Sequence, residues 1–239
     1  MNEFVPTVSA EQAERIRAWH LNAYQAMKAE GAGGQTFAYL GRTLIVPPEV
    51  MPITGMHERL GNAVLAEVGE EDRVLDMGTG SGVNAILAAA TARRVLAVDI
   101  NPIAVAAARD NAVTNGVADR VEVRESDVFT AVDGEFDLIV FDPPYRWFAP
   151  RDLLEAASTD QNYRAMTTFF REAHRHLTPE GRMLIAFGSS GDLGYLRGLI
   201  AEHRLRTEVL AHRDLVKDGV RVDYYVFRLT RAALQPSDM

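Results

Sequence analysis

The chain has 239 residues, a formal net charge of −8 and no cysteine. Its length suits one sizeable hydrophobic core, its acidic balance disfavours general binding to nucleic acid, and the lack of cysteine excludes disulfides, thiolate zinc sites and cysteine nucleophiles. The first twenty residues include an early acid and no apolar segment, and no later stretch is long and uncharged enough to cross a bilayer. We therefore expect a cytoplasmic protein with no membrane partner.

The first predicted element is an amphipathic helix. Ser9 and Gln12 form a capping-box pattern, apolar residues then recur at helical spacing, and Gly31 ends the pattern. Residues 35–48 indicate two short strands around Gly41 and Arg42, and residues 49–68 lead into a second helix that ends near Gly69. We expect a small appendage over residues 1–70, a main domain over residues 71–232 and a polar tail over residues 233–239.

From Arg73 onward, predicted strands and helices alternate. The apolar runs of the strands show no alternation, which is typical of strands covered on both faces, and this predicts an α/β fold with a doubly wound, mostly parallel sheet. Asn101 followed by Pro102 marks a helix start, and Gly116 marks its end. The predicted strands are 73–78, 93–100, 120–126 and 136–142, and the predicted helices between them are 83–92 and 102–116.

The last third of the chain predicts a change of strand direction. A helix over residues 163–177, a turn at 179–181, a strand over 182–189 and a helix ending near His203 continue the alternation. Two apolar segments then flank Asp218 and Gly219, a pair typical of a tight hairpin turn. An antiparallel hairpin at the end of the chain would make the sheet mixed.

A glycine loop between the first core strand and the following helix indicates a nucleotide-like ligand. Gly78, Gly80 and Gly82 let a ligand approach the backbone at the carboxyl edge of the sheet. A dinucleotide site would need a small residue where Val83 stands, and Asp76 before the loop would repel a pyrophosphate. An acid there suits S-adenosylmethionine, which carries an ammonium and a sulfonium and no phosphate.

Two further acids follow the next two core strands. Asp99 is placed to accept hydrogen bonds from both hydroxyls of a ribose. Asp127 is placed to accept one from the adenine amino group, with Val128 or Phe129 against the ring. Each acid alone fits a helix cap or a turn equally well. Acids at the ends of three successive parallel strands favour a cofactor site, because ligands of open sheets bind at that edge.

The segments LDMGTGSG, AVDI, ESDVF and DPPY occur in that order, and through them the chain resembles the class I S-adenosylmethionine-dependent methyltransferases from about Val46 to Thr230. The resemblance implies a Rossmann-like, seven-stranded sheet whose last strand is antiparallel. It also implies a cofactor site around the methionyl part, the ribose and the adenine. The residues concerned are Asp76, Gly78, Thr79, Gly80, Asp99, Ile100, Asp127, Val128 and Asp142.

The DPPY segment predicts a catalytic site for nitrogen methylation. Amide, guanidine and ring-attached amino nitrogens react poorly because their lone pair is delocalised, and acceptors that hold the N–H hydrogens can turn the lone pair toward the methyl group. Asp142 supplies a carboxylate, Pro143 supplies a carbonyl on a stiff backbone, and Tyr145 can stack on the planar group. The alternative is a Pro-Pro turn with core aromatics. Arg146, Trp147 and Phe148 either line a substrate pocket or pack the loop.

The segment is similar to the signature of amino and amide methyltransferases, and its surroundings are similar to the release-factor glutamine methyltransferase family. Two features depart from that family: its members have Asn at the position of Asp142, and they have a larger N-terminal helical domain. We therefore expect an N-methyltransferase acting on an amide, amino or guanidino nitrogen of a small molecule or peptide. The alternatives are a base amine of tRNA or rRNA, and a non-catalytic cofactor-binding subunit.

The remaining candidates carry no predicted chemistry. His57 with Glu58, and His174 with His176, lack the spacing of metal ligands, so we expect surface or packing histidines and no metal site. Asp160, at the start of the helix after the motif, either reaches the substrate, together with the Tyr163 and Arg164 that follow, or caps that helix. A NAD-dependent oxidoreductase is a distant alternative.

Overall fold

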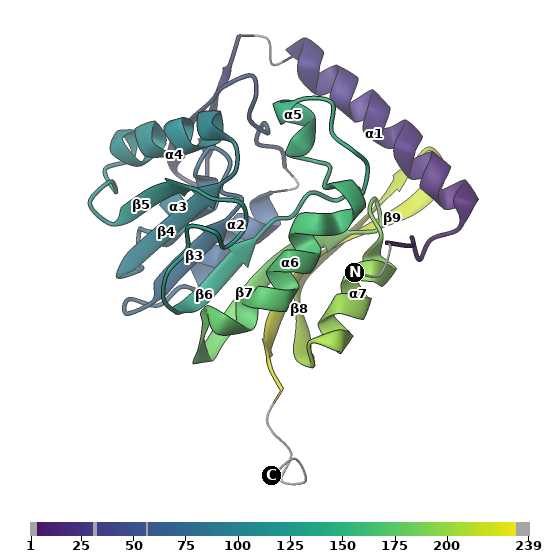
Figure 1. The fold of residues 1–239 in the computed structure, drawn as a ribbon. Coiled ribbons are helices and arrows are strands. Elements are labelled where there is room, and N and C mark those ends of the chain that lie inside the picture. Colours follow the sequence, from purple (N-terminus) through teal and green to yellow (C-terminus); the bar gives the residue numbers. More distant parts are fainter. Residues whose placement is uncertain (1–3, 31–32, 56, 233–239) are drawn as a thin grey trace, which may run out of the picture.

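The computed structural model describes residues 4–30, 33–55 and 57–232; the expected tail over residues 233–239 lies outside them. Seven strands form one sheet in the order β5-β4-β3-β6-β7-β9-β8 (Figure 1). Their bounds are β3 Arg73–Met77, β4 Arg94–Asp99, β5 Val121–Glu125, β6 Phe136–Phe141, β7 Leu177–Gly188, β8 Leu205–Lys217 and β9 Val220–Arg231.

Strand direction confirms the predicted mixed sheet. The pairs β5–β4, β4–β3, β3–β6 and β6–β7 are all parallel. Strand β9 runs antiparallel to both β7 and β8, between which it lies. The last strand of the chain is therefore the antiparallel one, as predicted.

Helices cover both faces of the sheet (Figure 1). Successive strand residues point to opposite faces, so Val74 and Leu138 pack with α2, α3 and α4, whereas Leu75 and Ile139 pack with α1, α6 and α7. This explains the unbroken apolar runs in the sequence, since both faces of each central strand are buried. The helices are α1 Ala10–Glu30, α2 Glu58–Glu67, α3 Val83–Ala88, α4 Pro102–Thr114, α5 Leu153–Ala156, α6 Arg164–Glu172 and α7 Leu193–Glu202.

The segment before the sheet forms a helix and a hairpin, as expected. The Ser9 hydroxyl accepts a hydrogen bond from the backbone N–H of Gln12 at 3.2 Å, which caps α1. Strands β1 (Gln35–Tyr39) and β2 (Arg42–Val46) pair antiparallel. The turn consists of Leu40 and Gly41, both at positive φ, so Arg42 is the first residue of β2 and not part of the turn.

The region after the motif differs in two places from the prediction. Helix α6 ends at Glu172 and is followed by a short 3-10 turn, Ala173–Arg175, so the helix is shorter than residues 163–177. Leu177 already belongs to β7, and the expected turn at 179–181 is an irregularity inside that strand. Phe136 pairs with Leu177 and Leu138 pairs with Arg182, so residues 178–181 lie between two paired positions.

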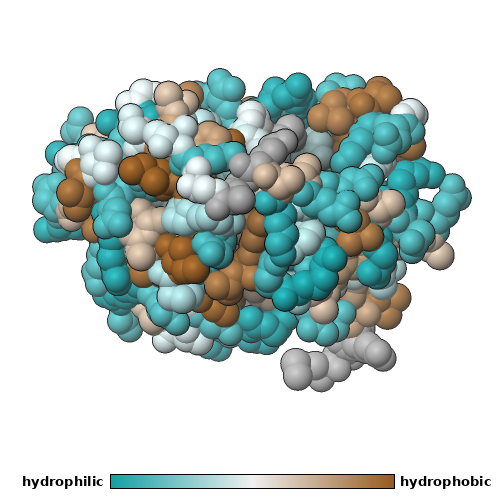
Figure 2. Space-filling model, turned by 90° about the horizontal axis from the view of Figure 1, so that it is seen from above, coloured by the Kyte–Doolittle hydropathy of each residue, from teal (hydrophilic) through white to brown (hydrophobic). Residues whose placement is uncertain are grey.

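The surface seen from above carries both hydrophobic and hydrophilic residues. Figure 2 shows hydrophobic residues in groups among hydrophilic ones, with several adjoining hydrophobic residues near the middle of that face. Within the part of the chain that the structure describes, no helix is both long enough and apolar enough to span a bilayer.

Candidate active site

The glycine loop follows β3 at the carboxyl edge of the sheet. Gly78, Gly80 and Gly82 adopt φ of +68°, +55° and +87°, a left-handed backbone that other residues rarely adopt. A Cβ at Gly82 would lie 3.1 Å from Ala108 of α4, so this glycine lets α3 begin close against α4. A Cβ at Gly80 would meet only Val50, at 3.9 Å. The loop therefore presents backbone, and not side chains, at the edge.

Asp76 is buried beneath this loop, with 1% of its surface exposed. Its Oδ2 accepts hydrogen bonds from the Thr79 hydroxyl at 2.5 Å and from the Ala85 N–H at 3.0 Å. Burial raises the pKa of Asp76 to about 7, against the opposing effect of these two bonds. Asp76 thus holds the loop in shape, and a cation bound nearby would favour its ionised form.

Asp99 ends β4 and also binds the glycine loop. Its Oδ2 accepts a hydrogen bond from the Gly80 N–H at 2.8 Å, and its Oδ1 accepts one from the Asn101 N–H at 2.9 Å. Burial raises the pKa of Asp99, while these backbone bonds act in the opposite direction. Each carboxylate oxygen can accept a further hydrogen bond. Ile100, the next residue, leaves 55% of its surface exposed beside it.

Asp127 follows β5 and forms an ion pair with Arg164. Both of its carboxylate oxygens accept hydrogen bonds from the Arg164 guanidinium, at 2.9 and 3.0 Å, on the surface. Val128 lies beside it at φ +51°, an unusual conformation for a β-branched residue, and the Ser126 hydroxyl donates to its carbonyl at 2.8 Å. Phe129 packs in the core against Phe169, and both candidates for an adenine contact are buried, Val128 at 7% and Phe129 at 6% exposure.

The DPPY segment leaves the sheet beside the glycine loop. Met77 at the end of β3 pairs with Phe141 at the end of β6, so Gly78 and Asp142 emerge from neighbouring strand ends. The Asp142 side chain is 22% exposed. Burial raises the pKa of Asp142, and His57 and a hydrogen bond with Tyr145 oppose this effect. The predicted catalytic acid and the predicted cofactor loop therefore share one site.

Tyr145 is fixed by residues that the sequence analysis did not identify as supports. Its carbonyl accepts a hydrogen bond from the Tyr163 hydroxyl at 2.6 Å, and that hydroxyl accepts one from the Asp192 N–H at 2.9 Å. A Cβ at Gly191 would lie 2.1 Å from the same carbonyl, so only glycine fits there. The Tyr145 ring packs against Phe187, with 4.8 Å between centroids. The motif is thus held in one conformation.

The Pro143 carbonyl has free acceptor capacity. Among the described residues, no donor forms a hydrogen bond with it.

Trp147 and Phe148 are each 8% exposed and pack against one another at 5.0 Å between centroids, so they pack the loop and do not line an open pocket. Asp160 accepts hydrogen bonds from the N–H groups of Ala165 and Met166, both at 3.0 Å, and so caps α6.

His57 lies in the site, contrary to our expectation of a surface or packing residue. Its Nε2 lies 3.9 Å from Oδ2 of Asp142. Its Nδ1 accepts a hydrogen bond from the Thr54 N–H at 2.9 Å, so neutral His57 carries its proton on Nε2, facing the acid. Spacing along the chain did not reveal this contact, because a loop brings the start of α2 over the end of β6.

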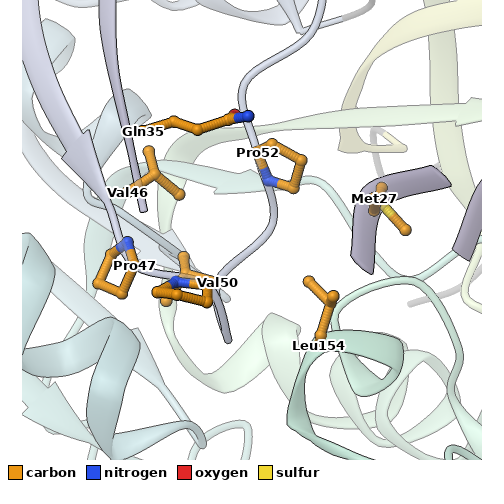
Figure 3. A pocket seen from close by; sticks show the side chains of 8 residues that line it. Met27, Gln35, Val46, Pro47, Val50, Pro52 and Leu154 are labelled. Carbon is orange, nitrogen blue, oxygen red and sulfur yellow. The ribbon is translucent and has the colours of Figure 1, made fainter. Parts of the chain in front are cut away.

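The loop over residues 47–53 borders a small hollow beside the site. Val50 and Pro52 line it from one side, and Met27 of α1 and Leu154 of α5 line it from the other (Figure 3). Its volume of about 20 Å³ holds no more than a water molecule. The Asn101 amide donates to the Glu49 carbonyl at 2.9 Å and ties this loop to the start of α4. The described residues contain no cluster of acids and histidines able to hold a metal ion.

Comparison with known proteins agrees with this geometry. The family described as methyltransferase small domain matches residues 59–213. A release factor glutamine methyltransferase of Cereibacter sphaeroides is 36% identical over 168 residues, which cover 64% of this chain and 59% of the relative. A putative protein N5-glutamine methyltransferase of Methanocaldococcus jannaschii is 44% identical over 82 residues, covering 34% of this chain and 40% of the relative. The alignments thus span less than two thirds of both relatives.

A solved structure extends the likeness to the fold. A ribosomal protein L11 methylase of Lactobacillus delbrueckii subsp. bulgaricus superimposes with a TM-score of 0.58 at 21% identity, covering 79% of this chain and 84% of that one. The fold and the site thus define a Rossmann-like methyltransferase. The chain belongs to the methyltransferase small domain family, whose match covers residues 59–213.

The family implies S-adenosylmethionine as the methyl donor, and the residues present fit that molecule. The buried Asp76 carboxylate suits a cationic group, and Asp99 retains acceptor capacity for hydroxyls beside the exposed Ile100. No arginine or lysine forms an ion pair with Asp76 or Asp99 among the described residues, so a cationic ligand meets no competing charge there.

Proposed function

We propose that this protein transfers a methyl group from S-adenosylmethionine to an amide nitrogen of a peptide or protein, with a glutamine side chain as the first candidate acceptor. The observation that carries this proposal is the position of Asp142, Pro143 and Tyr145 next to the glycine loop, at the paired ends of β6 and β3. The named activity of the two glutamine-methylating relatives supports the same acceptor.

In the proposed cofactor site, residues at the ends of β3, β4 and β5 contact successive parts of S-adenosylmethionine. Asp76, Gly78, Thr79 and Gly80 would hold the methionyl part, and Asp142 would border it. Asp99 would accept hydrogen bonds from the ribose, with Ile100 against the sugar or the ring; this is supported by the exposure of Ile100. Asp127 would reach the adenine amino group beside Val128. For this, the Asp127 carboxylate must either bind Arg164 and the adenine together or give up its hydrogen bonds with Arg164.

The chain's own residues then prepare the acceptor. When bound, S-adenosylmethionine supplies an electrophilic methyl group on a sulfonium. The Asp142 carboxylate and the Pro143 carbonyl hold the two N–H hydrogens, which directs the nitrogen lone pair toward the methyl carbon. Tyr145 stacks on the amide plane. One N–H proton must leave on methylation, and Asp142, whose pKa burial raises, is placed to accept it.

A base amine of RNA is the second candidate, favoured by one observation. Asp142 is a carboxylate, which accepts hydrogen bonds from an exocyclic amine more strongly than a neutral amide does. The net charge of −8 opposes a large phosphate interface, so we place this candidate second. A non-catalytic cofactor-binding subunit is the least favoured reading, because the motif is intact and held rigidly.

We further propose that residues 1–70 form an appendage on the substrate side of a catalytic domain over residues 71–232. Helix α1 is held near the motif by a hydrogen bond between His20 and Glu155 at 2.8 Å, both of which are buried. Tyr24 of the same helix donates a hydrogen bond to Asp152. We propose the cytoplasm as the compartment, in keeping with a chain without cysteine.

The test is a methyl-transfer assay with labelled S-adenosylmethionine. A host extract is separated by size, and the large fraction is assayed with and without ribonuclease and with and without protease. Label that protease removes and ribonuclease leaves supports the proposal, and hydrolysis to N5-methylglutamine identifies the acceptor. Ribonuclease-sensitive label supports the RNA candidate. Cofactor binding without any labelled product supports a non-catalytic subunit.

A further inference from the structure

We infer that Arg146 and Lys217 form a binding site for a carboxylate of the substrate, beside the nitrogen to be methylated. This inference rests on the proposed N-methyltransferase function and names a feature of its substrate. The peptide or amino-acid derivative that carries the acceptor amide would also carry an acidic group close to it. Four segments build the site: the DPPY loop, α1, the end of β8 and β9.

Arg146 directly follows the motif and has no anionic partner. Its Nε is buried without a hydrogen bond, and among the described residues its guanidinium forms no ion pair. Its backbone is fixed on both sides, because its N–H donates to the Ser158 carbonyl at 3.3 Å and its carbonyl accepts from the Asp160 N–H at 2.7 Å. A buried polar atom without a hydrogen bond, such as this Nε, is costly, and such atoms are normally satisfied by a ligand or by water.

Three tyrosines lie near Arg146. Tyr145, Tyr163 and Tyr224 are the residues whose electrostatic effect on Arg146 is largest after burial itself. Burial raises the pKa of both Tyr145 and Tyr163, so neither becomes a phenolate that could neutralise the guanidinium. Tyr145 lies closest in the sequence, with its ring centroid 5.8 Å from the Arg146 guanidinium carbon.

Lys217 brings a second cation to the same place. Burial lowers the pKa of Lys217, and the neighbouring charge of Arg146 lowers it further. Its Nζ lies 5.1 Å from the ring centroid of Trp19 in α1, and it forms no ion pair among the described residues. The nearby acid, Asp218, accepts a hydrogen bond from the Trp19 indole at 2.6 Å. It forms no ion pair with either cation among the described residues, but its charge raises the pKa of Lys217. Two cations beside this one acid leave a net positive charge, which predicts an anionic ligand.

The position of Arg146 and Lys217 indicates where the substrate carboxylate would lie relative to the acceptor amide. The Arg146 guanidinium carbon lies 5.8 Å from the centroid of the Tyr145 ring, which would stack on the acceptor amide, so a carboxylate held by Arg146 would lie close to that amide. A guanidinium fork matches the two oxygens of a carboxylate, and an ammonium adds a point charge. The phosphate backbone of RNA fits less well, because it needs an extended basic surface and the chain carries a net charge of −8.

The experiment compares matched substrates that differ only in a carboxylate. One pair consists of capped peptides with a single glutamine, next to either glutamate or the uncharged, similarly shaped methionine. The second pair is N-acetylglutamine, with its carboxylate, and N-acetylglutamine methylamide, without it. Methyl transfer is measured with wild type, Arg146→Gln, Lys217→Gln and the control Arg197→Gln, which removes an exposed cation on α7.

We expect wild type to prefer the carboxylate-bearing member of at least one pair by roughly 10- to 100-fold in kcat/KM. Preference within the peptide pair identifies a peptide carboxylate, and preference within the acetylglutamine pair alone identifies a small acid. Arg146→Gln should remove the preference and leave the uncharged substrates nearly unchanged, and Lys217→Gln should reduce it. Arg197→Gln should keep it. No preference in wild type, or an equal loss on both members in Arg146→Gln, would overturn the inference.

A binding measurement separates this inference from the proposed function. Thermal unfolding is followed with S-adenosylhomocysteine and increasing glutarate, a dicarboxylate without an amide. Stabilisation of wild type but not of Arg146→Gln supports the carboxylate site even when no glutamine substrate is methylated, and no stabilisation of wild type contradicts it. Stabilisation by a short RNA that depends on Arg146 assigns the site to phosphate instead, which also contradicts it.

A folding control completes the test. Since the Arg146 guanidinium forms no ion pair among the described residues, and its ring contact with Tyr145 is long at 5.8 Å, Arg146→Gln should melt at the wild-type temperature or above. A clearly lower melting temperature would show that Arg146 supports the fold through contacts of its own, and would overturn its assignment to a ligand.

Discussion

Nε2 of His57 lies 3.9 Å from Oδ2 of Asp142, across the start of the DPPY loop. The two residues are 85 positions apart in the sequence, His57 at the start of α2 and Asp142 after β6. The Thr54 N–H holds the other ring nitrogen of His57 as an acceptor at 2.9 Å. A hydrogen-bonded histidine thus faces the acid that is proposed to hold the acceptor nitrogen.

Asp142→Ala should lower kcat by at least about 100-fold, because it removes an acceptor that orients the nitrogen. The affinity for S-adenosylhomocysteine should change little. The measurements are methyl transfer at saturating substrate and calorimetric titration of the cofactor product. Asp110→Asn, at an exposed position of α4, serves as the control. Activity of Asp142→Ala near that of wild type would contradict the assigned role.

Replacing His57 with phenylalanine should shift the pH dependence of the reaction. His57 lowers the pKa of Asp142, which burial raises, so its removal should raise that pKa further. Activity requires the Asp142 carboxylate and is lost as pH falls through this pKa. The acid limb of kcat/KM should therefore move to higher pH in His57→Phe, with a small change on the plateau. An unmoved limb would mean that the two side chains are not coupled.

Cofactor binding should strengthen as pH rises from 6 to 8. Burial raises the pKa of Asp76 to about 7 from its ordinary value of 3.8, so the free protein is largely protonated at this site below pH 7. A cationic ligand binds the ionised form, and binding near pH 7 should release a proton. Calorimetry of S-adenosylmethionine in two buffers of different ionisation enthalpy measures this release. Asp76→Asn should abolish both the release and the pH dependence.

Asp99→Ala should weaken cofactor binding by roughly 1–3 kcal/mol, the cost of losing hydrogen bonds to a charged acceptor. The Gly80 and Asn101 N–H groups also lose their partner, so Asp99→Asn is the informative companion variant, because its amide oxygen can still accept from one of them. Titration with S-adenosylhomocysteine gives both affinities. Unchanged affinity in the two variants would make Asp99 a structural cap only.

Glu155→Gln should destabilise the fold by roughly 1–3 kcal/mol at neutral pH. The hydrogen bonds from Arg151 are the largest effect that lowers the pKa of Glu155, to about 2 from an ordinary 4.5, with His20 adding to it. A depressed acid pKa contributes stability that is full above 4.5 and is lost as pH falls toward 2. Denaturant unfolding of both proteins at neutral pH and in this acid range measures the difference, which should shrink as the pH falls.

The sequence predicted the sheet well because its signals are local. The unbroken apolar strands, the cap at Asn101 and the hairpin at Asp218 each depend on a few neighbouring residues, and the structure has all of them. The irregular start of β7 was missed because Pro179 and Gly181 indicate a turn locally, whereas pairing of Leu177 with Phe136 keeps the segment in the sheet.

The strand ends explain why the candidate residues lie at one edge of the sheet. Asp76, Asp99 and Asp142 follow from strand order, since carboxyl ends of parallel strands share one edge. His57, Tyr163 and Gly191 could not be placed, because each reaches the motif through a long-range contact that no spacing encodes. The bond between Asp127 and Arg164 joins residues 37 positions apart and was equally hidden.

The hydroxyl of Tyr163 joins the Tyr145 carbonyl to the Asp192 N–H, and the Asp192 carboxylate in turn accepts a hydrogen bond from the Thr7 N–H at 2.6 Å. Thr7 and Asp192 are 185 positions apart. During synthesis the DPPY motif therefore emerges well before Asp192, which supports it. Contacts between residues so far apart form slowly, because closing a long loop costs conformational entropy before the contact is made. The DPPY loop, the proposed catalytic segment, should acquire its final shape late in folding, after the central strands have paired.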